Sequence, residues 1–223
     1  RNYPSDACSV QAAIGAVNAV AFDISAACAG FIFAMNIVEG FFKAGIYKTA
    51  LIIGAETLSK VTDWSDRGTC VLFGDGAGAA VLKAEETGII DMMMGADGTK
   101  GDVLACTSRT VGNFLTGTKP ELGFMTMDGQ EVFKFAVRKV PESVMELLQR
   151  TGTKKEDIKY YVLHQANERI IEAAARRLKE PMEKFPMTIG QFGNTSTASI
   201  PLLLDDMIQK DMLKRGDKII MSG

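Results

Sequence analysis

The stretch AVAFDISAACAGFIFAMNIVEGFFKAG, residues 19–45, decides the fold class of this chain. Residues 19–24 have the apolar character of a short β-strand, and residues 30–44 repeat apolar side chains at helical spacing before Gly45 ends the helix. A strand, a sharp turn and a helix in succession form the building unit of an α/β protein. The turn carries Cys28, whose neighbours are small. Because the turn leads directly into the helix, we expect the Cys28 sulfur to face the helix N-terminus.

The same alternation of apolar runs and amphipathic stretches continues along the chain and favours a layered α/β fold with largely parallel strands. A long irregular excursion covers residues 96–123. Asp128 and Glu131 have the spacing of a capping box for a helix that continues past Pro141 to about Leu147. Asn167 is expected to cap a helix that ends near Lys179. Further strands are predicted at residues 49–54, 68–73, 77–82, 88–95, 158–163 and 217–221, and a further helical stretch at residues 195–213.

Composition excludes several classes of protein. The 223 residues are 47% apolar and carry a net charge of −2, so no overall field favours nucleic acid or a membrane surface. The longest apolar runs are far shorter than the roughly 18 residues that a membrane-spanning helix needs. Four cysteines without a CxxC pair suit a reducing cytoplasm. The abrupt ends suggest a fragment of a longer protein.

Three residues are candidates for chemistry. Cys28 lies where a helix dipole would favour a thiolate, although it could equally be a buried core cysteine, as we assume for the other three. His164 is the only histidine and ends an apolar strand, a position where α/β proteins bind ligands. Asn194 precedes a helix and could be a simple N-cap. None of the three identifies a function alone.

Five motifs together carry a family resemblance. AACAGF (26–31), DRGT (66–69), FGDGAG (73–78), LHQAN (163–167) and GNTS (193–196), in this order and at these separations, resemble the β-ketoacyl-acyl-carrier-protein synthase III family of the thiolase superfamily. The resemblance runs along essentially the whole chain. It implies the thiolase-like αβαβα fold of two similar halves, here residues 1–88 and 89–223, truncated at both ends.

The resemblance also implies a catalytic triad of Cys28, His164 and Asn194. A cysteine thiolate is a good nucleophile toward thioesters and a good leaving group, so Cys28 would hold the acyl group. Neutral His164 and the Asn194 amide would then donate to the enolate that forms when a malonyl thioester loses carbon dioxide. The Cys28 N–H would supply one oxyanion donor, and a Gly-rich turn that follows the last strand in the family would supply the other.

Further roles follow from the resemblance alone. Leu72 and Phe73 match residues of the acyl pocket, and Arg67 and Arg169 match arginines that contact the coenzyme A nucleotide. Asn167, Gly129 and Phe133 match residues along the pantetheine channel. Tyr3 matches an aromatic side chain that enters the pocket of a partner subunit.

FGDGAG is expected to be a structural turn, because no Lys-Ser/Thr of a phosphate loop follows it.

The partners implied are acyl-coenzyme A, the acyl carrier protein and a second copy of the chain, with no metal and no cofactor beyond the substrates. Arg169, Arg176 and Arg177 form a basic patch that would attract an acidic carrier protein, and a solvated helix face is the alternative.

Three rival hypotheses remain at this point. A papain-like hydrolase shares the order Cys, His, Asn, but the local sequence around the cysteine differs. Another thiolase-superfamily enzyme, such as a hydroxymethylglutaryl-coenzyme A synthase or a secondary-metabolite starter enzyme, would use similar residues. A catalytically inactive fragment that serves as an interaction module is the third. Because about a quarter of the family's length would precede Arg1 and the Gly-rich turn would follow Gly223, we expect the chain by itself to be inactive.

Overall fold

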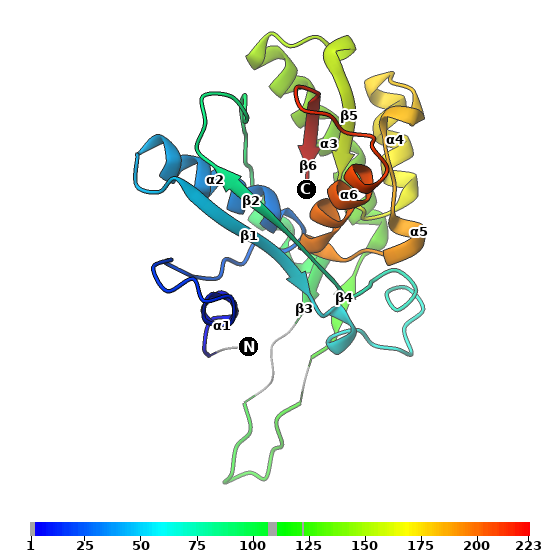
Figure 1. Ribbon diagram of the computed structural model, residues 1–223. Helices are drawn as coiled ribbons and strands as arrows, with labels where there is room; N and C mark the ends of the chain where they lie inside the picture. Colours follow the sequence, from blue (N-terminus) through cyan, green and yellow to red (C-terminus); the bar gives the residue numbers. More distant parts are fainter. Residues whose placement is uncertain (1–2, 107–110, 122) are drawn as a thin grey trace.

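A computed structural model describes residues 3–106, 111–121 and 123–223 of the chain (Figure 1). The α-helices are α1 (Asp6–Ala13), α2 (Gly30–Lys43), α3 (Gly129–Thr151), α4 (Glu168–Leu178), α5 (Ile189–Phe192) and α6 (Ser199–Gln209). The strands are β1 (Thr49–Glu56), β2 (Gly76–Lys83), β3 (Leu104–Cys106), β4 (Met125–Met127), β5 (Ile158–Leu163) and β6 (Lys218–Ser222). Short 3₁₀ helices are η1 (Ala27–Ala29), η2 (Leu58–Lys60), η3 (Gly98–Val103), η4 (Lys155–Asp157), η5 (Met182–Lys184) and η6 (Ser196–Ala198).

The strands form pairs, and the prediction of largely parallel pairing is wrong for the described part of the chain. There β5 and β6 pair in parallel, whereas β1 pairs with β2, and β3 with β4, in antiparallel register. Glu56 at the end of β1 lies opposite Gly76 at the start of β2, so the chain returns along the strand it has just left. A parallel pair would instead need a crossover to the opposite end, usually through a helix.

Three predicted strands are absent from the described structure. Residues 19–24 and 88–95 run without regular structure, residues 68–72 form consecutive turns, and Phe73 makes an isolated bridge with Asn194. In those turns the N–H groups of Thr69 and Cys70 donate to the Asp66 carbonyl, at 3.2 and 3.0 Å. An apolar run becomes a strand only where a neighbouring strand accepts its hydrogen bonds. The predicted strand 49–54 does form, as β1, but its residues alternate between exposed and buried rather than being buried throughout.

The predicted helices are confirmed with adjusted ends. Asn167 caps α4, because its Oδ1 accepts from the Arg169 N–H at 2.9 Å. Pro141 lies inside α3, which continues to Thr151 and ends at the left-handed Gly152. The stretch 195–213 contains η6 and α6, which ends at Gln209. The positive φ of Ser196, 49°, prevents a regular α-helix from beginning at residue 195.

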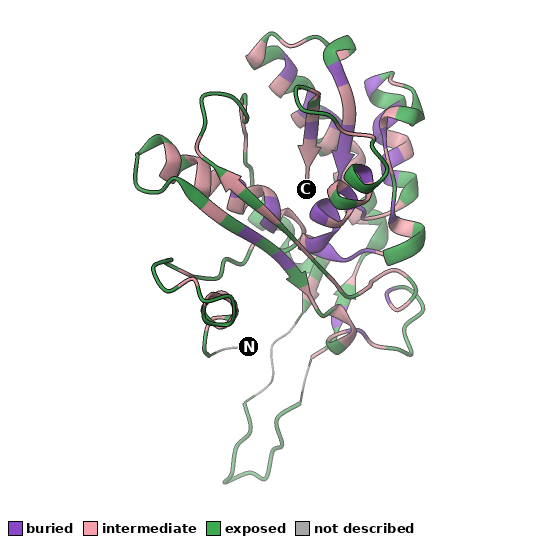
Figure 2. Cartoon of the chain, viewed as in Figure 1, coloured by how far each residue is buried: buried purple, intermediate pink, exposed green. Residues whose placement is uncertain are grey.

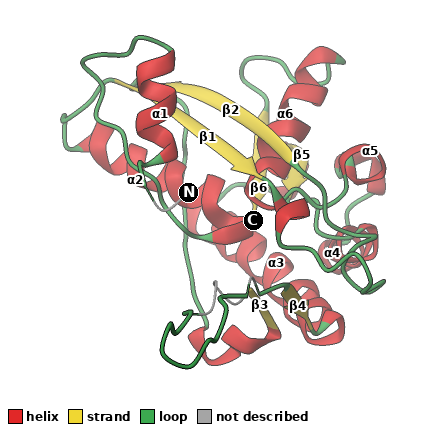
Figure 3. Cartoon of the chain, turned by 90° about the horizontal axis from the view of Figure 1, so that it is seen from below, coloured by secondary structure: helices red, strands yellow, loops and turns green. Residues whose placement is uncertain are grey.

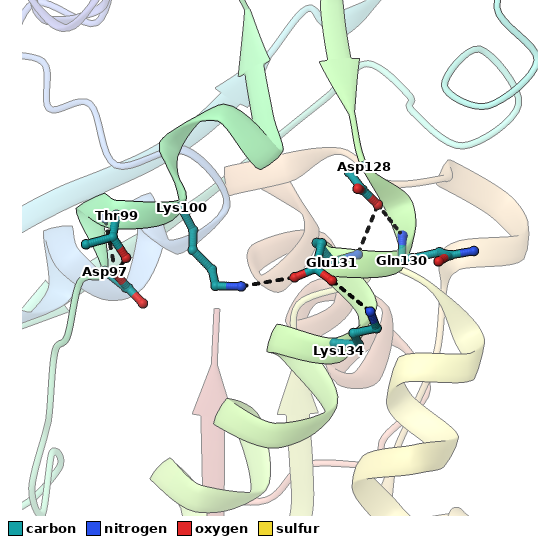
Figure 4. A network of polar contacts seen from close by, with 7 residues as sticks. All are labelled: Asp97, Thr99, Lys100, Asp128, Gln130, Glu131 and Lys134. Carbon is teal, nitrogen blue, oxygen red and sulfur yellow. Dashed lines mark hydrogen bonds and ion pairs between the residues drawn. The ribbon is translucent and has the colours of Figure 1, made fainter.

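The start of α3 is held by one half of the predicted capping box (Figure 4). The Asp128 carboxylate accepts from the N–H groups two and three residues ahead, at 3.0 and 3.1 Å. Glu131 does not bond back to the Asp128 N–H, which donates to the Val103 carbonyl at 2.8 Å. Its carboxylate binds Lys134 at 2.7 Å and Lys100 at 3.0 Å, and these hydrogen bonds lower the pKa of Glu131 to about 2. Glu131 therefore joins η3 to α3.

Two clusters of buried side chains make the core (Figure 2). The first lies among α3, α4 and β5 and includes Val144, Tyr161 and Ile171. The second brings together α2, β1, β5 and α6, and contains Phe31, Met35, Ile52, Val162, Ile200, Leu203 and Met207. Figure 3 shows α6 beside the β1–β2 pair and near β5 and β6. The segment that carries Cys28 and the segment that carries His164 therefore share one core.

Candidate active site

Cys28 lies in η1, immediately before α2, as the sequence predicts. The preceding residue, Ala27, has a positive φ of 45°, which is unusual for a residue with a Cβ. The Ala27 carbonyl accepts a hydrogen bond from the Thr197 hydroxyl at 2.5 Å. A Cβ at Gly30 would lie 2.9 Å from that same hydroxyl oxygen, so glycine is needed for this close approach of α2 and η6. The backbone around the thiol is therefore fixed by the segment after Asn194.

The thiol of Cys28 has an environment that favours its neutral form. Burial raises the pKa of Cys28, and the negative charge of Glu56 raises it further, whereas the Ser196 hydroxyl and the Cys28 N–H lower it. The expected thiolate at the helix N-terminus is thus corrected to a thiol, because desolvation outweighs the local dipoles.

His164 follows β5 and is held from both sides. Its N–H donates to the Ser222 carbonyl of β6 at 2.7 Å, which continues the parallel pairing. Its Nδ1 lies 2.6 Å from the Ser199 Oγ, at the start of α6. Burial lowers the pKa of His164 to about 4, so the imidazole is neutral at pH 7.

Asn194 is buried and fixed through both its backbone and its side chain. Its N–H donates to the Leu72 carbonyl at 2.8 Å, and its carbonyl accepts from the Gly74 N–H at 3.0 Å. A Cβ at Gly74 would collide with the Phe192 carbonyl oxygen, so glycine is required there. The Asn194 Oδ1 accepts from the Ser196 N–H at 3.0 Å, which leaves the amide NH₂ as the free donor of this side chain within the described structure.

One short segment, residues 194–199, therefore connects all three candidate residues. It contains Asn194, its Ser196 faces the Cys28 thiol, and its Ser199 contacts the His164 ring. Gly223 completes the arrangement, because a Cβ there would lie 3.1 Å from the Cys28 carbonyl oxygen. Residues that are more than 160 positions apart in the sequence are thus brought together, as the motif resemblance implies.

Two polar residues of this site were not singled out from the sequence. The Ser196 hydroxyl donates to the Glu56 carboxylate at 3.1 Å, and both lie beside Cys28. Glu56 is the polar end of an apolar strand, and Ser196 is the last residue of GNTS. A polar residue at the end of an apolar strand could have indicated Glu56 as a site residue. Its contact with Ser196 depends on the fold and has no signal in the sequence.

Some of the other predicted site residues contact the three candidate residues, and others do not. Leu72 and Phe73 are half-buried and lie against the Asn194 backbone. Arg67 is exposed in the loop between β1 and β2, and Gly129 and Phe133 are exposed in the first turns of α3. Asn167 and Arg169 lie at the start of α4, one turn beyond His164. In the described structure, no hydrogen bond or ion pair joins Arg67, Gly129 or Phe133 to the three candidate residues.

Of the basic patch, Arg169, Arg176 and Arg177 are all exposed on α4. The Arg177 guanidinium also donates to the Val137 carbonyl of α3 at 2.9 Å, so it takes part in helix packing.

Tyr3, the residue expected to enter a partner subunit, is 91% exposed. FGDGAG is not the predicted turn: Phe73 forms an isolated bridge with Asn194, and β2 begins at Gly76. Between them the Asp75 carboxylate accepts from the N–H and the hydroxyl of Ser59 at 2.8 and 2.6 Å.

The remaining cysteines do not all fit their expected role. Cys8 and Cys106 are exposed and Cys70 is half-buried, so the assumption that they are core residues is wrong. No disulfide joins any of the four cysteines, all of which lie in the described ranges. Within the described ranges, no cluster of three or more His, Cys, Asp and Glu side chains could hold a metal ion. Likewise, no helix there is long and apolar enough to cross a membrane.

Comparison with known proteins gives a consistent result. Residues 22–98 match the family model described as 3-oxoacyl-[acyl-carrier-protein (ACP)] synthase III, and residues 148–223 match the model of its C-terminal part. The chain is 53% identical over 222 residues to the beta-ketoacyl-[acyl-carrier-protein] synthase III of Clostridium novyi, covering 99% of this chain and 68% of that protein.

Solved structures agree. The 3-oxoacyl-[acyl-carrier-protein] synthase III of Aquifex aeolicus superposes with a TM-score of 0.89 at 44% identity, covering 100% of this chain and 69% of that one. The synthase III of Thermus thermophilus gives 0.90 at 40% identity, covering 99% and 68%.

These matches confirm the thiolase-like fold and exclude the papain-like hydrolase. The expectation that the chain by itself is inactive is not borne out. The chain belongs to the 3-oxoacyl-[acyl-carrier-protein] synthase III family of acyltransferases, the condensing enzymes of fatty-acid synthesis.

Proposed function

We propose that this chain catalyses the decarboxylative condensation of a short acyl group, supplied by acyl-coenzyme A, with malonyl-acyl-carrier-protein. The observation that carries the proposal is the segment 194–199, which contacts both Cys28 and His164 and itself contains Asn194. A nucleophile and two hydrogen-bond donors held by one rigid segment suit a reaction in which an acyl group waits on sulfur while an enolate forms beside it.

In the first step Cys28 attacks the carbonyl carbon of the acyl-coenzyme A thioester. A carbon–sulfur bond to Cys28 forms, and the coenzyme A thiolate leaves with a proton. Because burial raises the pKa of Cys28, its proton has to depart as the new bond forms. The Ser196 hydroxyl, which donates to Glu56 in the resting structure, lowers this pKa, and by turning its one proton to the sulfur it would stabilise the negative charge that develops there.

In the second step the malonyl thioester loses carbon dioxide, and the electron pair of the broken carbon–carbon bond passes into an enolate. Neutral His164 and the free amide NH₂ of Asn194 donate hydrogen bonds to the enolate oxygen. Neither donor adds a full positive charge, so neither forms an ion pair with the carboxylate that must depart. The enolate carbon then attacks the acyl carbonyl, and the Cys28 thiolate leaves.

The substrate-contact roles of the remaining residues are also proposed. The half-buried Leu72 and Phe73, which hold the Asn194 backbone, would line the acyl pocket. Asn167 uses Oδ1 to cap α4, so its amide NH₂ is left to donate to the pantetheine arm. The other proposed contacts with coenzyme A and pantetheine are Arg67, Gly129, Phe133 and Arg169.

The acidic carrier protein would dock on the exposed arginines of α4. Arg169 is exposed in the first turn of the helix that follows His164, and Arg176 is exposed in its last turn. Arg177 is the weaker candidate, because its guanidinium is partly used by the Val137 carbonyl.

We also propose an oligomeric state, a cellular compartment and a division of the chain into two halves. A homodimer is supported by Tyr3, which is 91% exposed, and by the outward apolar side chains Leu51 and Val81 of the β1–β2 pair, 43% and 71% exposed. The absence of disulfides among the four described cysteines is compatible with the reducing cytoplasm that we propose. Residues 1–88 would carry the nucleophile and residues 89–223 the two enolate donors, and the substrates would be the only small molecules required.

The test separates the two half-reactions. Replacing His164 or Asn194 with alanine should leave acylation of Cys28 by acyl-coenzyme A largely intact but lower the release of carbon dioxide from malonyl-carrier roughly 100-fold or more, as loss of an oxyanion donor does. Cys28→Ala should block acylation yet permit some decarboxylation. Intact mass and peptide mapping report the first half-reaction, and release of labelled carbon dioxide reports the second.

Two results would contradict the proposal. One is an acyl adduct on Cys8, Cys70 or Cys106 with Cys28 unmodified. Because Cys8 and Cys106 are exposed, they are accessible to acyl-coenzyme A and serve as internal controls. The other is decarboxylation at the parental rate in the His164 and Asn194 variants.

A further inference from the structure

The contact between His164 and Ser199 has a consequence for the protonation of the imidazole ring. The Ser199 Oγ lies 2.6 Å from Nδ1 and is almost completely buried, so water does not compete for this contact. A neutral imidazole carries its one proton on either Nδ1 or Nε2, and the partner of Nδ1 decides which.

A second hydrogen bond determines the direction of the first. The Gln165 N–H donates to the Ser199 Oγ at 3.3 Å and so occupies one lone pair of the hydroxyl. The hydroxyl proton then needs an acceptor, and in the described part of the chain Nδ1 of His164 is the only acceptor that the Ser199 Oγ–H contacts. If Nδ1 carried the proton instead, this buried hydroxyl donor would have no partner, which is unfavourable.

Gln165 itself is fixed, so the direction of the hydrogen bond is maintained. It is buried, its Nε2 donates to the Leu163 carbonyl at 2.8 Å, and its Oε1 accepts from the Thr188 N–H at 2.9 Å. The turn that carries the Gln165 N–H therefore cannot easily rotate away from Ser199.

We propose that Ser199 is a positioning residue that donates its hydroxyl proton to Nδ1 of His164, and thereby holds the ring in the tautomer with the proton on Nε2. The Nε2–H then faces away from Ser199 as the donor for the enolate oxygen. The catalytic consequence rests on the proposed function, whereas the tautomer itself does not. Burial also lowers the pKa of His164 to about 4, so this neutral tautomer persists throughout the range in which the enzyme would work.

Nuclear magnetic resonance tests the tautomer directly, because His164 is the only histidine of the chain. Protein labelled with ¹⁵N-histidine gives one pair of ring nitrogen signals at pH 7.5. We expect an unprotonated Nδ1 and a protonated Nε2 in the parent protein. Ser199→Ala should shift the signals toward a mixture of tautomers, and Ser199→Thr, which keeps the hydroxyl, should restore the parental pattern.

Ser143→Ala is the matched control, since that half-buried hydroxyl bonds only to a carbonyl of its own helix, at 2.9 Å. It should leave the ring signals unchanged. A parent protein with the proton on Nδ1 would overturn the proposal, as would a Ser199→Ala variant that keeps a pure Nε2–H tautomer. The parent spectrum decides the first point even if a variant does not fold.

A kinetic measurement adds the link to function. Ser199→Ala should lower the rate of malonyl-carrier decarboxylation by roughly 10- to 100-fold, while acylation of Cys28 proceeds at the parental rate. Equal loss of both half-reactions would indicate a merely structural role and contradict the proposal. If His164→Ala decarboxylates normally, the proposed function fails, but the tautomer result still stands on the spectrum alone.

Discussion

At the scale of single residues, the charge beside Cys28 is the feature that most affects its reactivity. Glu56 bonds to Ser196 and raises the pKa of the Cys28 thiol, although the reaction requires the sulfur to become negative. The raised pKa therefore favours the thiol form of this proposed nucleophile. A protonated thiol is slow to react with oxidants and stray electrophiles.

Replacing Glu56 with glutamine tests this interpretation. Glutamine can still accept the Ser196 hydrogen bond but carries no charge, so the pKa of Cys28 should fall. The pH midpoint of alkylation by iodoacetamide, followed at the Cys28 peptide by mass spectrometry, should move to lower pH. Glu146→Gln, a change at an exposed position of α3, should leave the midpoint in place. A midpoint that rises or stays unchanged in Glu56→Gln would show that the carboxylate does not act on the thiol.

At the scale of elements, the junction between η3 and α3 shows how the chain fixes the start of its longest helix. Asp128 satisfies two N–H groups of the first turn, and Glu131 joins the helix to Lys100 of η3 (Figure 4). Gly129 and Phe133, the proposed wall of the pantetheine channel, lie in this same first part of the helix. The cap and the ion pairs therefore set the position of that wall.

Removing the cap should weaken the helix start. Asp128→Ala is expected to lower the free energy of unfolding by about 0.5–2 kcal/mol, because two N–H groups lose their acceptor. Asp128→Asn, which keeps a side-chain oxygen at the same place, should lose only a small part of that. Equilibrium unfolding in urea measures both. Equal destabilisation by alanine and asparagine would point to the charge of Asp128, and not to its hydrogen bonds.

At the scale of the whole molecule, the two ends of the proposed reaction path lie on different elements of a shared core. Phe31 of α2 and Val162 of β5 belong to one buried cluster. This shared packing holds the segments of Cys28 and His164 in fixed positions relative to each other. Arg169 and Arg176 of α4 are exposed outside this core, so they can be replaced without disturbing it. Binding of the carrier protein and the chemistry should therefore be separable.

The double change Arg169→Ala with Arg176→Ala should slow association with malonyl-carrier by roughly threefold or more at low salt and reduce the salt dependence of that rate. Acylation from a short thioester without a nucleotide should remain near the parental rate. Stopped-flow association at several salt concentrations measures the first effect. Lys43→Ala, at an exposed cation on α2, is the control and should alter neither rate. Identical salt dependence in the arginine variant and the parent would remove α4 from the docking surface.

The sequence by itself determined the family, the helices α2, α3, α4 and α6, and the three candidate residues, but it did not indicate α1 or α5. Five short motifs in fixed order carry the resemblance, and local signals such as the Asn167 cap and the apolar spacing of α2 need no distant partner. Residues 19–24, 68–73 and 88–95 were predicted as strands and are not, because a strand depends on a neighbour that local sequence does not contain.

Only the tertiary structure decided the environment of the candidate residues. It brought Glu56 and Ser196 to the Cys28 thiol, changed its expected thiolate into a thiol through burial, and set Ser199 against His164. Hydrogen-bond direction and desolvation depend on atoms from segments far apart in the chain. Their effects on pKa and tautomer therefore arise only when those segments pack together.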